Sequence, residues 1–375
     1  QKEELSKLLQ LQEEFSDFGM HPDDSARLSE LVASAFGDDD TAGVTCCTLS
    51  TAVDDNDLGR PAWAAVIDEA AQAIEPAVWQ LLQRGIRRLV LVGDPLQLPA
   101  VCRSEDARKA SLDRSLFERL TSGASPYHHC MLTHQMRMHP EIAELASQVF
   151  YEGRLSSGVS RDDRAHPQPS QPPWISDSHL LFWRVLGAEE EPRGLGVRNV
   201  READAVHALV KQLNRNSIVF LRIAVLTPYR GQLSVLQSRL SAEVQQGLDV
   251  ATVDSYQGRE ADYIIVSLVR SNNKRSVGFL ADARRANVAL TRGRRGVIIV
   301  GNDRCVVHSA PWCSVLRWME RSSLGATGDP SAPTAIELCT EAAAGGPPPS
   351  PPPSPGEDTA SDGVSPPTPP TEERV

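Results

Sequence analysis

The chain has 375 residues, of which 41% are hydrophobic and 23% charged, a mixture typical of a globular protein with two or three domains. The formal net charge is −11, and no apolar run approaches the ~18 residues of a membrane-spanning helix. The first residues, QKEELSKLLQ, lack the apolar core of a secretory signal.

The negative charge lies at the two ends of the chain. Residues 1–60 hold 4 Lys and Arg against 14 Asp and Glu, and residues 322–375 hold 1 against 8. Residues 61–321, by contrast, hold 33 basic against 27 acidic side chains, and nine of the basic ones fall within 270–304. A polyanion responds to the local field, so the acidic total does not exclude a nucleic-acid partner. The alternative reading of the basic stretch is a solvated face.

The seven cysteines form no CxxC pair, and no histidine pair has zinc-finger spacing. This usage indicates reduced cysteines in an intracellular protein rather than a zinc site. The cytoplasm and the nucleus fit equally well.

Residues 1–36 are expected to form two helices, because leucines recur near helical spacing, and the segment 37–40 ends the second one. From residue 44 onward short apolar strands alternate with helices, which favours an α/β fold with parallel sheets. The expected strands cover residues 44–49, 63–67, 88–92, 129–133, 180–185, 223–227, 262–269 and 296–300. The expected helices cover residues 76–84, 113–120, 140–150, 201–214, 230–240 and 282–294. Residues 152–178 are expected to form a long surface loop.

The tail from residue 326 contains 13 of the 27 prolines, including the run PPPSPPPSP at 347–355. Such a segment cannot bury a core, so we expect a disordered or polyproline-like tail. The two readings of the tail are a plain solvated segment and a docking site for a proline-binding protein module.

Two apolar strands, one βαβ unit apart, end in polar residues. Asp68 and Glu69 end the strand of AAVIDEAAQ, and the carboxyl end of a buried parallel strand faces the ligand crevice of an open sheet. One carboxylate there can help to hold Mg²⁺, and the next can orient or deprotonate an attacking water. Gln97 follows in LVLVGDPLQLPA, on a stiff loop where its amide can sense a terminal phosphate. The alternatives are a helix cap and an ordinary βα turn.

Three further segments carry arginines. LTHQMRMHPEI places Gln135 and Arg137 before a helix that a proline starts, and an arginine at a domain boundary can reach a nucleotide. VATVDSYQGREADYIIV places Gly258 and Glu260 in a loop between two strands. RRANVALTRGRRGVIIV contains Arg292, a candidate arginine finger that stabilises charge on a transferring phosphoryl group. Taken singly, each arginine also fits a role as surface charge.

Together and in this order, the five segments resemble the motifs of superfamily 1 helicases, in particular the group of the regulators of nonsense transcripts (up-frameshift) and senataxin. VIDEAAQAIEP looks like the Walker B motif, LVGDPLQLPAV like motif III, TVDSYQGRE like motif V and NVALTRGRRG like motif VI. HQMRMHP looks like QYRMHP, with Met136 in place of the tyrosine, and VTCCTLS at 44–50 resembles a motif that touches the nucleic-acid strand. The resemblance covers roughly residues 1–320.

The resemblance implies two RecA-like P-loop NTPase domains with parallel sheets and with ATP in the cleft between them. Carried over position by position, Asp68 would serve Mg²⁺, Glu69 would activate water, and Gln97 would sense the γ-phosphate. Arg137 and Arg292 would act as fingers from the second domain. The other positions that the resemblance assigns to the nucleotide are Gln135, Gly258 and Glu260.

The same resemblance implies single-stranded RNA or DNA as the partner. The residues that would grip the strand are Thr48, Thr227, Pro228, Tyr229, Thr252 and Ser255. Such contacts go mainly to phosphates and sugars, so binding would tolerate many sequences.

The sequence departs from the family at the phosphate-binding loop. A P-loop reads GxxxxGK[ST], but none of the 25 glycines here is followed by lysine. We therefore expect a truncated first domain: residues 1–43 would end a helical insertion, and 44–130 would form part of the first RecA-like domain. Residues 131–325 would form the second RecA-like domain, and 326–375 the tail.

The expected function is that of an ATP-dependent RNA or DNA helicase that translocates in the 5′ to 3′ direction, present as a fragment that hydrolyses ATP poorly by itself. The alternative is a catalytically inactive, helicase-like scaffold that binds nucleic acid or proteins. The missing P-loop favours the scaffold, whereas the intact acidic pair and arginines oppose it. A dehydrogenase is disfavoured because no GxGxxG follows a strand.

Overall fold

A computed structural model describes residues 45–54, 62–83, 85–122, 129–166, 178–215, 222–322 and 326–327. The chain divides into two units, residues 1–63 with 80–86, and residues 64–79 with 87–375. The helices expected over 1–36, the predicted insertion 1–43 and nearly all of the proline-rich tail lie outside the described residues. Within the described ranges, no helix is both long and apolar enough to cross a bilayer. The domain boundaries at residues 43, 130 and 325 stay predictions.

The first described helix, α3 (Leu49–Asp54), replaces the strand expected over residues 44–49. Residues 45–48 have no regular structure and are exposed. The Thr48 side-chain oxygen accepts a hydrogen bond from the Thr51 backbone N–H at 3.1 Å, and the Thr48 carbonyl accepts one from Ala52 at 2.9 Å. The threonine therefore caps and starts a helix, which outweighs the β propensity of the segment.

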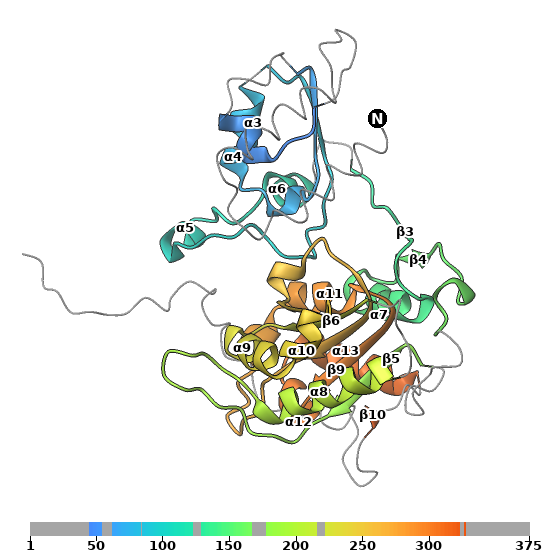
Figure 1. The fold of residues 1–375 in the computed structure, drawn as a ribbon. Helices are drawn as coiled ribbons and strands as arrows, with labels where there is room; N and C mark the ends of the chain where they lie inside the picture. Colours follow the sequence, from blue (N-terminus) through green and yellow to red (C-terminus); the bar gives the residue numbers. More distant parts are fainter. Residues whose placement is uncertain are drawn as a thin grey trace, which may run out of the picture. The chain divides into compact units, whose positions relative to one another are not determined.

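Strands and helices are interspersed from residue 64 to the end of the described chain (Figure 1). The strands are β1 (Ala64–Ile67), β2 (Arg88–Leu91), β3 (His134–Gln135), β4 (Ser156–Ser157), β5 (Leu180–Arg184), β6 (Ile223–Thr227), β7 (Asp249–Thr252), β8 (Ala261–Ser267), β9 (Gly293–Gly301) and β10 (Ala326–Thr327). The α-helices are α4 (Glu75–Leu82), α5 (Glu105–Lys109), α6 (Leu116–Thr121), α7 (Pro140–Phe150), α8 (Val200–Arg215), α9 (Arg230–Arg239), α10 (Ser241–Gln245), α11 (Ala283–Leu290), α12 (Asp303–Val306) and α13 (Ala310–Arg321). Short 3-10 turns are η1 (Ala70–Gln72), η2 (Asp162–Arg164), η3 (Asp254–Tyr256) and η4 (Gly278–Ala281).

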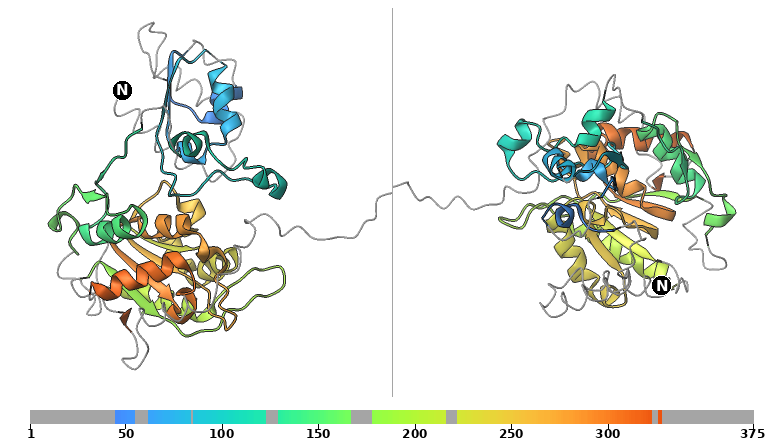
Figure 2. Two further views of the ribbon diagram at one scale, coloured as in Figure 1. Left: turned by 180° about the vertical axis from the view of Figure 1, so that it is seen from behind. Right: turned by 90° about the horizontal axis from the view of Figure 1, so that it is seen from above.

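The largest sheet is parallel throughout and has the strand order β10-β5-β9-β8-β6-β7. Successive side chains of its central strands enter two different apolar clusters. Val225 and Ile265 pack with α8 and α9, whereas Leu226 and Val266 pack with α7, α11 and α13. Figure 2 shows these helices on opposite faces of the sheet. Both faces are covered, which explains why the strands read as continuous apolar runs, and the predicted α/β class with parallel sheets is confirmed.

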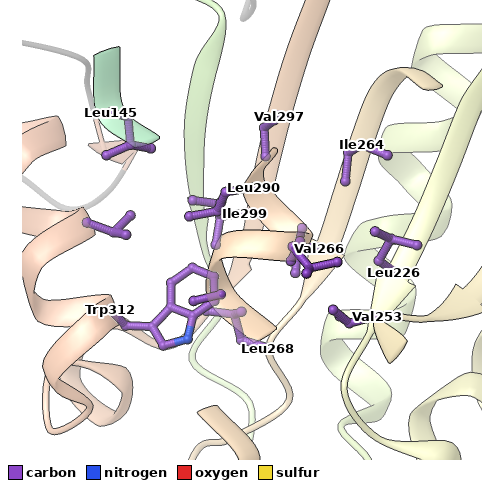
Figure 3. Close-up of a cluster of buried hydrophobic side chains, with 14 of the residues drawn as sticks. Leu145, Leu226, Val253, Ile264, Val266, Leu268, Leu290, Val297, Ile299 and Trp312 are labelled. Carbon is purple, nitrogen blue, oxygen red and sulfur yellow. The ribbon is translucent and has the colours of Figure 1, made fainter. Parts of the chain in front are cut away.

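Trp312 of α13 is the largest side chain of the cluster that contains α7 and α11 (Figure 3). It shares this cluster with Leu145 of α7, Leu290 of α11 and Ile299 of β9. The packing fixes α7 and α11 on the sheet. Two residues of the candidate site lie next to these helices: Arg137 shortly before α7, and Arg292 shortly after α11.

β1 and β2 form a separate two-stranded parallel sheet, in which Val66 lies opposite Val90. Both valines are more than half exposed. The strands expected over 63–67 and 88–92 are confirmed by this pair. The residues that follow the two strands include Asp68, Glu69 and Gln97, so the pair brings these segments to the same edge of the sheet.

Several expectations need correction. Residues 129–133 contain no strand; the neighbouring strand β3 covers only two residues, and Leu132 is largely exposed. The helix expected over 282–294 ends at Leu290, because β9 already begins at Gly293. The expected surface loop 152–178 contains β4, η2 and the buried His166 in its described part. Among the described cysteines, Cys46, Cys47, Cys102, Cys130 and Cys305 are reduced thiols, as expected, whereas Cys313 is disulfide-bonded.

Candidate functional site

Asp68 and Glu69 stand at the carboxyl end of β1. Glu69 has φ 51° and ψ 37°, a left-handed conformation that is uncommon for a residue with a side chain. Asp68 Oδ1 accepts from the Glu69 backbone N–H at 2.9 Å, while Glu69 Oε2 accepts from Gln72 at 3.1 Å and from Gln257 at 3.4 Å. Asp68 is exposed and Glu69 half-buried, so the pair offers the carboxylate oxygens that Mg²⁺ prefers.

Asp94 anchors the loop that follows β2. Its Oδ1 accepts from the Leu96 backbone N–H at 2.9 Å. Its Oδ2 accepts from Gln97 Nε2 at 2.9 Å and from the Tyr151 hydroxyl at 2.5 Å. The Gln97 amide is therefore held in one orientation, with its oxygen free to face a donor.

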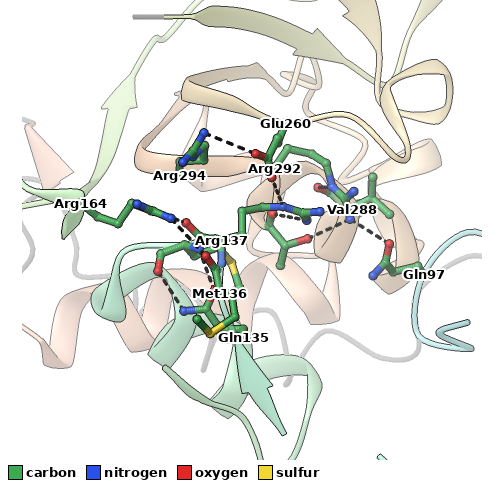
Figure 4. Close-up of polar contacts among 11 residues, drawn as sticks. Gln97, Gln135, Met136, Arg137, Arg164, Glu260, Val288, Arg292 and Arg294 are labelled. Carbon is green, nitrogen blue, oxygen red and sulfur yellow. Dashed lines mark hydrogen bonds and ion pairs between the residues drawn. The ribbon is translucent and has the colours of Figure 1, made fainter. Parts of the chain in front are cut away.

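Arg292 lies in the turn between α11 and β9, with 2% of its surface exposed. Its NH2 donates to Gln97 Oε1 at 2.8 Å, and its Nε donates to the Val288 carbonyl at 3.2 Å (Figure 4). Burial lowers the pKa of Arg292 to about 10, the charge of Arg137 lowers it as well, and the Glu69 carboxylate raises it. The guanidinium is buried against neutral acceptors, so the site favours an anion.

Arg137 precedes α7 and is held by acceptors from two other segments. Its Nε donates to Glu260 Oε2 at 2.7 Å, and its NH1 donates to the Thr291 carbonyl at 3.2 Å. Gln135 Oε1 accepts from the Arg137 backbone N–H at 2.9 Å. Arg294 approaches Glu260 at 3.6 Å. The structure thus brings Gln135, Arg137 and Glu260 together, next to Arg292 (Figure 4).

Gly258 lies in the loop between η3 and β8, two residues before Glu260. It has φ +80°, in the left-handed region, and no atom comes within 4 Å of the place of a Cβ. The backbone conformation, rather than crowding, therefore calls for glycine at this position.

Four of the six residues expected to contact a nucleic-acid strand reach the surface. Ser255 is exposed, and the half-buried Thr252 donates to its hydroxyl oxygen at 2.9 Å. Pro228 is half-buried, and Thr48, which belongs to the other unit of the chain, is exposed.

The remaining two, Thr227 and Tyr229, are buried, and their contact with a strand stays a prediction. Thr227 is fully buried at the end of β6, and Tyr229 is 5% exposed. The Tyr229 hydroxyl donates to the Val277 carbonyl at 3.2 Å and accepts from the Phe279 backbone N–H at 3.1 Å. The loop 277–279 thus packs over Tyr229, while the Thr227 hydroxyl accepts from the Tyr229 backbone N–H at 3.4 Å.

A cavity of about 130 Å³ lies beside the acidic pair. Its lining includes Gln72 and Gln257, the two glutamines that bond to Glu69. Its charged lining residues are Arg103, Arg108, Arg285, Glu105, Asp113 and Asp254. Because the two signs balance, this cavity is polar rather than cationic.

Sequence reasoning did not single out Asp94, Tyr151 or Asn287, which connect the site to two helices. Asn287 is fully buried among the apolar residues of α11, and its Nδ2 donates to the Tyr151 hydroxyl at 2.8 Å and to the Leu96 carbonyl at 2.9 Å. The signal in the sequence was a polar residue on the apolar face of a helix, which requires hydrogen-bond partners when it is buried.

Comparison with known proteins gives two family matches. A family model described as an AAA domain matches residues 112–304, and a second model with the same description matches residues 39–105. The first match covers more than half of the chain.

Individual relatives include three proteins with more than 35% identity. The "Regulator of nonsense transcripts 1" of Caenorhabditis elegans is 37% identical over 330 residues, which cover 82% of this chain and 29% of that protein. The "ATP-dependent helicase upf1" of Schizosaccharomyces pombe is 38% identical over 319 residues, with 82% and 34% covered. The "ATP-dependent helicase NAM7" of Saccharomyces cerevisiae is 37% identical over 325 residues, with 84% and 33% covered. The chain thus spans about a third or less of the length of these relatives.

Among solved structures, that of a PRRSV helicase is similar to 73% of this chain and 44% of its own, with 18% identity and a TM-score of 0.34. The family models and the curated relatives agree with the group that the five motifs indicated. We conclude that the chain belongs to the superfamily 1 helicases, in the group of the regulators of nonsense transcripts.

Proposed function

We propose that the chain contributes to ATP hydrolysis in a helicase that moves along single-stranded RNA or DNA in the 5′ to 3′ direction. The observation that supports this most directly is the buried Arg292, which bonds to Gln97 and lies in the field of Glu69 and Arg137. A phosphoryl group gains negative charge at its oxygens during transfer, and preorganised cations stabilise that charge. A buried arginine whose hydrogen-bond acceptors are neutral keeps its positive charge available to a transferring phosphoryl group.

In this proposal, each polar residue of the site has a separate task. Asp68 holds Mg²⁺, which screens the phosphate charge when it is bound, and Glu69 orients or deprotonates the attacking water. Gln97 senses the terminal phosphate, since its amide both donates and accepts. Arg137 and Arg292 stabilise the developing charge. The remaining proposed contacts are Gln135, Gly258 and Glu260 to the nucleotide, and Thr48, Pro228, Thr252 and Ser255 to the strand.

The 375 residues contain no Gly-Lys pair, so the loop that would cradle the phosphates is not within this sequence. We therefore expect little hydrolysis by these residues alone, and hydrolysis stimulated by single strands from the full-length gene product.

The test is steady-state ATP hydrolysis by both proteins, without nucleic acid, with single-stranded RNA and with single-stranded DNA. The Glu69→Gln variant is the matched control, because it keeps the shape and removes the base. We expect at least roughly tenfold stimulation by one of the strands, and its loss in the variant. Strand binding without hydrolysis by the full-length product would instead support the inactive scaffold. Robust turnover by the 375 residues alone would contradict the need for a separate phosphate loop.

A further inference from the structure

Tyr151 joins the helix α7 to the loop that carries Gln97. It is buried immediately after the last residue of α7, and its hydroxyl donates to Asp94 Oδ2 at 2.5 Å. The same hydroxyl accepts from Asn287 Nδ2 of α11 at 2.8 Å. The Tyr151 hydroxyl therefore connects two helices, α7 and α11, to the loop 94–97.

The hydrogen bonds of this network fix the direction of every donor. Asp94 is a carboxylate and can only accept, so the Gln97 amide must turn its Nε2 toward Asp94 and its Oε1 toward Arg292. The phenol has a single proton, which it gives to Asp94, and therefore it must accept from Asn287. A reversed Gln97 amide would place two donors against each other at Arg292.

We propose that Tyr151, supported by Asn287, is a positioning residue that holds Asp94 and thereby keeps the Gln97 oxygen on Arg292. This inference rests on the proposed function, in which Gln97 and Arg292 act on the terminal phosphate. The Tyr151 hydroxyl donates to the same Asp94 oxygen that accepts from Gln97, and the nearby Gln97 amide lowers the pKa of the phenol, so the three side chains form one group.

The burial of Tyr151 and Asn287 supports a positioning role for both side chains. Burial, and then the charge of Asp94, raise the pKa of Tyr151, so the phenol stays protonated and remains a donor. Asn287 Oδ1 is buried without a hydrogen-bond partner in the described part of the chain, although its Nδ2 makes two bonds. An asparagine kept there at the cost of an unpaired oxygen is explained by the two donations to Tyr151 and to the loop.

Hydrogen exchange of the 375-residue chain tests whether Tyr151 holds the loop. The Leu96 backbone N–H donates to Asp94 Oδ1 at 2.9 Å and that of Gln97 to the Asp94 carbonyl at 3.1 Å. In Tyr151→Phe, which keeps the ring, we expect exchange of these two amides to be roughly threefold to tenfold faster. Asn287→Ala should act in the same direction. Tyr263→Phe is the matched control, because it removes another buried hydroxyl, which bonds to His166.

Kinetics of the full-length gene product test whether the position matters for hydrolysis. In Tyr151→Phe we expect kcat to fall roughly tenfold while the KM for ATP stays within about twofold, because the hydroxyl orients Gln97 without binding the nucleotide. In a Gln97→Ala background, Tyr151→Phe should lower kcat no further. A purely structural tyrosine would lower kcat by the same factor in both backgrounds.

Each outcome decides the inference. Unchanged exchange at Leu96 and Gln97, an unchanged kcat in an active enzyme, or equal effects in both backgrounds would overturn it. If the full-length product hydrolyses no ATP under any condition, the proposed function fails and the catalytic part of the inference fails with it. The exchange result then still decides whether Tyr151 holds the loop.

Discussion

The Arg292 guanidinium donates to the Gln97 amide oxygen at 2.8 Å across a separation of 195 residues in the sequence. This hydrogen bond gives a buried cation a neutral partner, and neutral partners stabilise a buried charge less than a carboxylate does. The pair connects the loop after β2 with the turn before β9.

Replacing Arg292 by alanine should greatly lower kcat for ATP hydrolysis and change the affinity for a single strand little. The arginine is proposed to act on transition-state charge, which is worth on the order of 10³–10⁵ in rate in other phosphoryl-transfer enzymes. The measurements are kcat of the full-length gene product and fluorescence anisotropy with a labelled single strand. Arg295→Ala is the control. It removes an arginine that lies only three residues from Arg292 and whose guanidinium pairs with Asp262 at 3.3 Å. An Arg292→Ala enzyme with normal kcat would remove this arginine from the proposed chemistry.

Replacing Gly93 by alanine should destabilise the loop that carries Gln97. A Cβ at Gly93 would lie 2.9 Å from the Ala71 backbone nitrogen and 3.1 Å from that of Ala70, which donates to the Val92 carbonyl at 2.8 Å. These backbone atoms cannot move without breaking that bond, so we expect a loss of roughly 1–3 kcal/mol in the free energy of unfolding by urea.

Gly158→Ala serves as the control for Gly93→Ala. The nearest atom to a Cβ there belongs to the end of the exposed Met136 side chain, which can turn away, and the nearest backbone atom is the Gln135 carbonyl oxygen at 3.2 Å, farther than the 2.9 Å at Gly93. Equal losses in the two variants would show that the close approach of Gly93 to η1 is not the cause.

Strand affinity should fall steeply with salt, because bound Lys and Arg displace the counterions that are condensed on the nucleic acid. We expect at least a roughly tenfold weaker binding of a single strand at 200 mM than at 50 mM salt. Anisotropy titrations with strands of different sequence should give similar slopes, since backbone contacts do not distinguish bases. An affinity that is flat over this range would count against a binding surface made of basic residues.

Three buried histidines form a stack beside the sheet. The ring of His179 lies between those of His139 and His166, with centroid distances of 3.4 and 3.9 Å. His166 Nε2 donates to the Ser178 carbonyl at 3.1 Å, so its Nδ1 must accept from the Tyr263 hydroxyl at 2.6 Å. Burial lowers the pKa of His139 to about 3 and that of His166 to about 4, and the neighbouring His179 lowers both.

Acidification should therefore remove the stability that the two neutral histidines contribute, in the pH range where unfolded histidines take up protons. Unfolded His139 and His166 bind protons below about pH 6.5, whereas in the folded protein they do so only below about pH 3–4, so the stability that they contribute is lost as the pH falls through this window. Burial raises the pKa of Glu141, and it raises the pKa of Glu202 to about 8, so both carboxyls take up protons first in the folded state and oppose the histidine effect at pH values above about 4.5. We therefore expect the change in Tm from pH 7.5 to pH 5.0 to be more negative, by roughly 5 °C, in the unchanged protein than in a variant in which His166 cannot titrate.

His166→Gln should flatten this pH dependence, because the amide can donate and accept but does not titrate in this range. His207→Gln is the control, since His207 lies outside the stack, beside Glu243. If His166→Gln showed the same drop in Tm as the unchanged protein, the stack would not be the source of the acid sensitivity.

Local sequence patterns predicted much of the second unit. The strand expected over 223–227 coincides with β6, and the helix expected over 140–150 coincides with α7. The helix α13 was missed although its signal was present: Trp312, Val315, Leu316 and Met319 are buried at helical spacing after a proline at the start of the helix. These elements are encoded locally, because side-chain periodicity decides which face of a helix or strand is apolar.

By itself, the sequence determined the family and the parallel α/β class, since motif residues and apolar runs are properties of short segments. Only the tertiary structure decided that Thr227 and Tyr229 are buried, that Arg292 bonds to Gln97, and that Tyr151 holds Asp94. Burial and hydrogen-bond partners depend on where distant segments meet, and no local pattern records which carboxylate, amide or phenol will lie opposite a given arginine once the sheet has assembled.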